Sequence, residues 1–172
     1  MKPTVTIPFG VGGMMLKAVQ VALFHEQYPT SYKHMAEDGD YYELVKSLWE
    51  KGEPFILNEH DIIPWPGAIK QLDDCDHPWC TFWYRSPAGW LSNGLGLVKF
   101  NPAQLPNIFK EPFDDTHWSG LDMRIAKRLQ AHGLEAHTHN PPITNLNTHM
   151  FLVSAKIHPP VPNMRTREDA TI

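Results

Sequence analysis

The 172-residue sequence has little of what marks several protein classes. Its two cysteines, Cys75 and Cys80, are too few for a disulfide framework and lack the paired spacing of a zinc site, so one or two buried free thiols are expected. No apolar run reaches the roughly 18–20 residues that span a bilayer, and the start of the chain lacks a signal-peptide core, so a cytoplasmic location is the default expectation. Without a long Lys/Arg run, a net charge of −4 argues against a general nucleic-acid binder.

The composition that remains is that of an ordinary globular domain, with 42% hydrophobic and 20% charged residues. The length suits one domain with a real core. We expect this domain over residues 1–155 and a proline-rich tail over 156–172, because regular structure should fade in the last forty residues.

Hydrophobic periodicity indicates the elements of this domain. Strands are expected at 5–9, 55–57, 79–84 and 95–100, and helices at 15–23, 40–52, 66–72, 102–109 and 117–132. A further short strand is indicated within 28–39. Strand–helix alternation in the first half predicts an α/β fold with a mainly parallel sheet covered by helices, and the second half looks mixed.

An acidic motif follows the apolar strand in residues 54–64. Glu59 and Asp61 are two residues apart, so an extended backbone would turn both to one side and His60 to the other. Ligands of open α/β sheets gather at the carboxyl ends of strands, which favours a divalent-metal or phosphate site. Without a cation or a shared proton the two carboxylates would repel each other. The alternative is that both acids are solvated turn residues.

From residue 37 onward the order of motifs resembles nucleotide-sugar glycosyltransferases of the GT-A fold, particularly the family-2-like group. The Glu-Asp-Gly-Asp segment at 37–40 leads through a helix and a strand to Glu59-His60-Asp61, which stands in place of the family's Asp-x-Asp motif. A proline turn and a helix follow. Residues 118–126 are similar to the family's acceptor-side helix, and residues 94–100 take the place of the strand before it. The likeness covers roughly residues 4–150.

The resemblance implies a GT-A-like mixed, mainly parallel sheet and an enzyme that moves a sugar from a nucleotide-sugar donor to an acceptor, with inversion. The acceptor could be a glycan, a protein or a small molecule, and Mn²⁺ or Mg²⁺ would be the cofactor. The implied site residues are the general base Asp122; metal-binding Asp61, Glu59 and His139; donor-binding Phe9, Gly10, Asp38, Asp40 and His60; and acceptor-binding Trp90 and Trp118.

Several of these residues have structural alternatives. Asp122 could belong to a capping box opened by Ser119, and Asp40 could open one with Glu43. Asp38 could likewise cap the helix.

The late histidines also leave alternatives open. His137 and His139 would share one face of a strand and could form a metal site with His149. Two other functions stay open on these grounds. One is a non-catalytic module that binds a nucleotide-sugar or glycan, and the other is a metal-dependent phosphoester hydrolase that combines the acidic motif with the late histidines.

Overall fold

The structure is a computed structural model that describes residues 2–10, 13–24, 26–85, 91–92, 94–140 and 143–145. A six-stranded sheet forms its centre, in the order β2-β1-β3-β8-β5-β9. The strands are β1 (Thr4–Phe9), β2 (Thr30–His34), β3 (Phe55–Asn58), β5 (Trp79–Phe82), β8 (Leu97–Phe100) and β9 (His137–His139). Strand β8 is antiparallel to both neighbours and the other three pairings are parallel, which confirms the predicted α/β class with a mixed, mainly parallel sheet.

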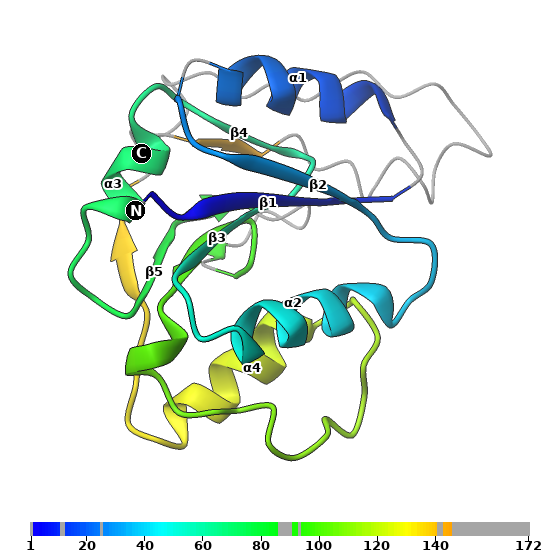
Figure 1. The fold of residues 1–172 in the computed structure, drawn as a ribbon, viewed down its shortest axis with the longest axis vertical. Coiled ribbons are helices and arrows are strands. Elements are labelled where there is room, and N and C mark those ends of the chain that lie inside the picture. The colour runs from blue at the N-terminus through cyan, green and yellow to red at the C-terminus, as the bar shows by residue number, and fades with distance from the viewer. Residues whose placement is uncertain are drawn as a thin grey trace.

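Helices cover both faces of this sheet (Figure 1). The helices are α1 (Gly13–Phe24) and α3 (Ala68–Asp73) on one face, and α2 (Asp40–Glu50) and α4 (Leu121–Gln130) on the other. Among the described residues no helix combines the length and the apolar character needed to cross a membrane.

Smaller elements complete the fold. They are the antiparallel pair β4 (Ile62–Pro64) and β10 (Ile143–Asn145), the antiparallel pair β6 (Tyr84–Arg85) and β7 (Leu91–Ser92), and the 3₁₀ turn η1 (Pro102–Gln104). The β4–β10 pair matters for the site, because β4 starts directly after the acidic motif and is held by a strand from the far end of the described chain.

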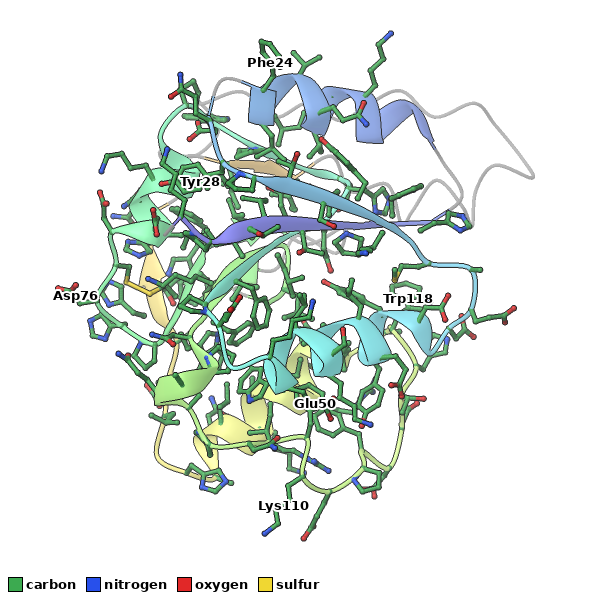
Figure 2. All side chains as sticks on the ribbon, viewed as in Figure 1. Phe24, Tyr28, Glu50, Asp76, Lys110 and Trp118 are labelled. Carbon is green, nitrogen blue, oxygen red and sulfur yellow. A yellow bond between two sulfur atoms is a disulfide. The ribbon has the colours of Figure 1, made fainter. Side chains whose placement is uncertain are left out.

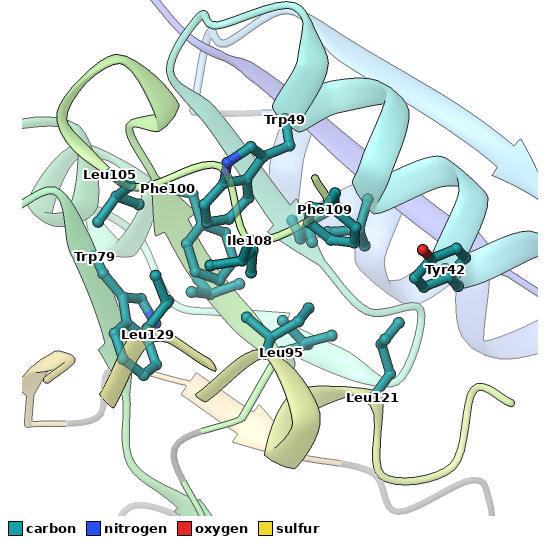
Figure 3. Close-up of a cluster of buried hydrophobic side chains, with 14 of the residues drawn as sticks. Tyr42, Trp49, Trp79, Leu95, Phe100, Leu105, Ile108, Phe109, Leu121 and Leu129 are labelled. Atoms are coloured by element: carbon teal, nitrogen blue, oxygen red, sulfur yellow. The ribbon is translucent and has the colours of Figure 1, made fainter. Parts of the chain in front are cut away.

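The alternation of side chains along β3 divides the core into two clusters. Phe55 and Leu57 face α2 and α4, whereas Ile56 faces α1 and α3. Figure 3 shows the first cluster, in which Trp49 of α2 packs edge-on against Phe55 with ring centroids 6.4 Å apart. The Trp49 ring also lies 5.2 Å from that of Phe100 on β8. This packing fixes the carboxyl-terminal end of α2 against the amino-terminal end of β3, opposite the end that leads into the acidic motif.

Two predicted elements differ from the structure. Residues 102–109 form only the turn η1 instead of a helix, because Leu105 precedes Pro106 and adopts an extended conformation with φ −117° and ψ 151°. The segment after 133, expected to be a loop or tail, contributes β9 and β10. Each of these strands has three residues, too few for a hydrophobic period, and sheet pairing forms them. The predicted tail at 156–172 lies outside the described residues.

The expectation of free thiols is wrong, because Cys75 and Cys80 are joined by a disulfide (Figure 2). The loop between α3 and β5 folds back and brings Cys75 over Cys80. Lys99 of β8 holds this loop, since its Nζ donates hydrogen bonds to the carbonyl oxygens of Cys75 and Asp73.

Candidate functional site

The acidic motif lies in a tight turn between β3 and β4, not on an extended strand as predicted. The amide of Ile62 donates to the Glu59 carbonyl oxygen at 3.0 Å and closes the turn. The fully buried Asn58 supports it from inside, because its Nδ2 donates to the carbonyl oxygens of Glu59 at 2.8 Å and Ile62 at 2.9 Å. One amide group therefore ties both ends of the turn that carries Glu59 and Asp61.

This role of Asn58 predicts a loss of stability. Leucine at position 58 has a similar size but cannot donate, so two carbonyl oxygens would lose their buried partner. We expect Asn58→Leu to lower the free energy of unfolding by about 1–3 kcal/mol. Urea denaturation measures this change, and a loss below about 0.5 kcal/mol would contradict the role given to Asn58.

Three acids interact electrostatically at this turn. The Glu59 carboxylate accepts a hydrogen bond of 3.1 Å from the Tyr41 hydroxyl on α2. Asp61 is 1% exposed, and Asp122 stands in the first turn of α4. The pKa of Glu59 is raised to about 8, first by burial of the carboxyl and then by the negative charges of Asp61 and Asp122, while the Tyr41 hydrogen bond opposes the rise. The site thus concentrates negative charge that only a proton or a cation can balance.

The raised pKa of Glu59 makes stability depend on pH. Between pH 4.5 and about 8 the folded chain holds a proton that the unfolded chain releases. This contribution to stability is full below pH 4.5 and is lost as the pH rises through about 8.

We therefore expect the unfolding midpoint of the native protein to fall, relative to that of Glu59→Gln, as the pH rises across this window. Thermal unfolding over a pH series measures it, with the exposed Glu53→Gln as control. Parallel curves for the native chain and Glu59→Gln would contradict the raised pKa.

A cavity of about 190 Å³ opens beside Glu59. The carboxyl end of β1, the loop before α2 and the turn after β3 meet there, as expected where parallel strands end. The lining residues are Pro8, Phe9, Gly10, Met35, Ala36, Glu37, Asp38, Tyr41, Glu59, His60 and Trp118. Four of the five residues predicted to bind a donor are therefore brought together around one cavity, and Trp118, predicted for the acceptor, joins them.

Asp40, the fifth predicted donor residue, has a structural role instead. Its carboxylate accepts hydrogen bonds from the amides of Ala36 at 2.8 Å and Glu37 at 3.0 Å, which lower its pKa. It does not form the expected capping box, since α2 has Gly39 at its N-cap and no side-chain cap. Asp40 therefore shapes the loop that lines the cavity without lining it.

Asp38 is held by a residue that the sequence did not single out. His117 Nε2 lies 3.3 Å from the Asp38 carboxylate, and His117 Nδ1 accepts from the amide of Ser119 at 3.0 Å. The His117 ring also stacks on Trp118 at 5.6 Å between centroids. This histidine joins the loop before α2 to the segment before α4 at the rim of the cavity.

Asp122 borders a second cavity, of about 370 Å³, on the α4 side of the sheet. Trp79, Trp83, Leu95 and Met123 are among the other side chains that line it. The expected capping box with Ser119 does not form, because the N-cap is Gly120. With φ +75°, Gly120 adopts the left-handed conformation that favours glycine, so α4 begins four residues later than predicted.

His139 does not join the acids, which corrects its predicted role as a ligand of the same metal. In the sheet, Leu57, Val98, Thr81 and Thr138 form one row across β3, β8, β5 and β9, and His139 directly follows Thr138. Three strand spacings separate the ends of that row by about 14 Å. His139 also packs against Phe82, on the α1 and α3 face, whereas Glu59 contacts α2.

Two predicted residues, Trp90 and His149, lie outside the described residues. Three residues were missed, namely Tyr41, Asn58 and His117. Tyr41 was recognised only as an apolar helix position. No sequence signal separates these side chains from ordinary core or loop residues, because their roles come from contacts between distant segments.

No family model and no curated protein sequence matches this chain. Among solved structures it is similar to A197 from STIV, with a TM-score of 0.59, 9% identity and 84% of each chain covered. It is also similar to a glycosyltransferase involved in the glycosylation of the major capsid of PBCV-1, with a TM-score of 0.46, 13% identity, and 81% of this chain and 83% of that chain covered. At these identities the comparisons concern the fold, and the fold that this chain shares is that of A197.

Proposed function

We propose that this protein is a GT-A-like glycosyltransferase that uses a nucleotide-sugar donor and a divalent cation. The observation that carries the proposal is the electrostatic interaction of Glu59 with Asp122 and with the buried Asp61, which itself lines neither cavity. Glu59 lines one cavity, Asp122 lines the other, and the charge of Asp122 acts on Glu59. A transfer reaction holds two substrates in fixed orientation, and two cavities that each contain one of two interacting acids are compatible with that.

The acids suit Mn²⁺ or Mg²⁺. Hard cations take oxygen ligands, and Mg²⁺ is commonly bound through one or two carboxylates together with substrate phosphates. In the part of the chain that the structure describes, ligand atoms of Glu59, Asp61 and Asp122 do not all lie within 4.8 Å of one another, so the proposal needs substrate phosphates to supply further ligands. Asp61 would hold the ion directly and Glu59 through water. The ion would neutralise charge on the diphosphate leaving group.

The first cavity suits the donor. Phe9 and Trp118 offer ring faces on which a base or a sugar can pack, and Asp38 offers acceptor oxygens for ribose or sugar hydroxyls. His117 contacts Asp38 at the rim of this cavity. These residues would bind the nucleoside part of the donor, so that its diphosphate lies toward Glu59 and Asp61.

The second cavity suits the acceptor. Trp83, 37% exposed, offers a surface for a sugar ring, and the Asp122 carboxylate lies at the same wall. Asp122 would take the proton of the acceptor hydroxyl while that oxygen bonds to the anomeric carbon and the bond from that carbon to the diphosphate breaks. Attack opposite to the leaving group gives inversion.

Nucleotide binding tests the proposal. Calorimetric titration with uridine and guanosine diphosphates should show binding that strengthens at least about tenfold with Mn²⁺, whereas Asp114→Asn, an exposed acid away from the turn, should bind like the native chain. Absence of binding to every nucleoside diphosphate would overturn the proposal. Binding without release of free diphosphate from any nucleotide-sugar would favour the non-catalytic module. The hydrolase alternative loses its basis, because it needed His139 beside the acids.

A further inference from the structure

A second group of metal-binding side chains lies at the β9 edge, on the opposite face of the sheet from the three acids. Ligand atoms of Cys75, His137 and His139 all lie within 4.8 Å of one another. They come from the loop after α3 and from the edge strand β9. In Figure 2 the disulfide lies beside Asp76, at the side of the molecule away from Trp118, so this group is separate from the donor cavity.

Cys80 provides a fourth sulfur or nitrogen atom. It is fully buried on β5 and pairs in register with His137 on β9, so these two side chains are neighbours on one face of the sheet. Its Sγ is bonded to that of Cys75. Three of these ligand atoms lie within 4.8 Å of one another, and the Cys80 sulfur is held next to them by its bond to Cys75. Two sulfurs and two imidazoles are the ligand set of a tetrahedral zinc site.

One histidine nitrogen here is left without a partner. The Nε2 atom of His139 is buried and makes no hydrogen bond to any group in the described part of the chain. Its Nδ1 atom lies 3.2 Å from the side-chain amide of Gln71 on α3. With the Gln71 oxygen turned toward Nδ1–H, the lone pair of Nε2 is available for a metal. Metal-binding histidines are usually fixed in this way by a hydrogen bond at the other ring nitrogen.

The surroundings of Cys75 attract cations. The Lys99 ammonium donates to the Cys75 carbonyl oxygen and so holds this loop against β8. Asp73, Asp74 and Asp76 act on the Lys99 ammonium, so the loop that carries Cys75 is acidic. An acidic loop raises the local concentration of divalent cations.

We propose that Cys75, Cys80, His137 and His139 form a zinc site when the disulfide is reduced. The disulfide and the zinc ion are then alternative links at one place. The disulfide ties the loop after α3 to β5, whereas zinc also ties both to the edge strand β9. This site does not depend on the proposed glycosyltransferase function.

The disulfide form becomes the zinc form in two steps, reduction and metal binding. A phosphine and one water give a phosphine oxide, and the disulfide takes up two electrons and two protons to become two thiols. A dithiol does the same and becomes a disulfide itself. Binding of Zn²⁺ then displaces both thiol protons, because thiolate is the form that ligates metal.

Metal titration of the full chain tests the site. After reduction by a phosphine and removal of the excess, we expect about one tightly held Zn²⁺ per chain, and none for the disulfide form. Zinc at about 100 times its dissociation constant should raise the unfolding midpoint of the reduced chain by about 5–10 °C. Cobalt in place of zinc should give thiolate-to-cobalt charge-transfer absorption, which a cation held by carboxylates would not give.

Variants complete the test. Cys75→Ser and His139→Gln should each lose the bound zinc and the cobalt absorption, while the exposed His132→Gln should keep both. The inference is overturned if the reduced native chain binds no more zinc than the disulfide form. It is equally overturned if cobalt binds to the reduced native chain without the thiolate absorption. This measurement uses the native chain and does not depend on the folding of a variant.

Discussion

Asp61→Asn is expected to weaken Mn²⁺-dependent binding of a nucleoside diphosphate by about 10²- to 10³-fold, because a metal ion contributes several kcal/mol through its carboxylate ligands. Asparagine keeps the size of the buried side chain but removes its charge. Calorimetric titration with and without Mn²⁺ measures the effect, and binding without metal should change little.

Asp114→Asn is the matched control, since it removes one carboxylate charge at an exposed position and should keep the metal effect. Equal Mn²⁺ enhancement in Asp61→Asn and the native chain would contradict the role of Asp61. Circular dichroism and the unfolding midpoint establish that each variant is folded.

Asp122→Asn should have the second large effect, and on a different step. A general base contributes about 10²- to 10⁴-fold to a rate, so sugar transfer should fall by this factor. Nucleotide binding should stay within about twofold of the native value, because Asp122 borders the other cavity. Release of free diphosphate from nucleotide-sugars measures the rate.

The two variants should affect different steps, because Asp61→Asn is expected to weaken nucleotide binding and Asp122→Asn to slow sugar transfer. If Asp122→Asn lost nucleotide binding and kept the rate per bound donor, Asp122 would belong to the donor site. Lys127→Ala, at an exposed position of the same helix that lines neither cavity, serves as the control for disturbance of α4.

Much of the fold could be predicted from the sequence because most elements carry a clear period. The strand at 55–57 and the helix at 40–52 have apolar positions at the spacing of their class, and both occur with ends within two residues of the prediction. Elements that depend on pairing or on a single proline, such as β10 and η1, could not be predicted, because no local period marks them.

The candidate site was predictable in its acids and only partly in its geometry. Glu59 and Asp61 were expected to share a side of an extended strand, whereas they lie in a turn tied by Asn58, where the charge of Asp61 acts on Glu59. His139 was expected beside them and lies across the sheet. Spacing along the chain indicates which residues can bind a metal, but the order of strands in the sheet decides which of these residues lie close together.

The central claim is that Glu59 and Asp61 hold a cation against a diphosphate in the cavity beside Tyr41. A crystal structure of the reduced protein with Mn²⁺ and uridine or guanosine diphosphate tests it most directly, through the anomalous signal of manganese. The account predicts a manganese peak at the turn after β3, with the nucleotide between Phe9 and Trp118. Manganese found elsewhere, or a nucleotide bound on the opposite face of the sheet, would contradict it.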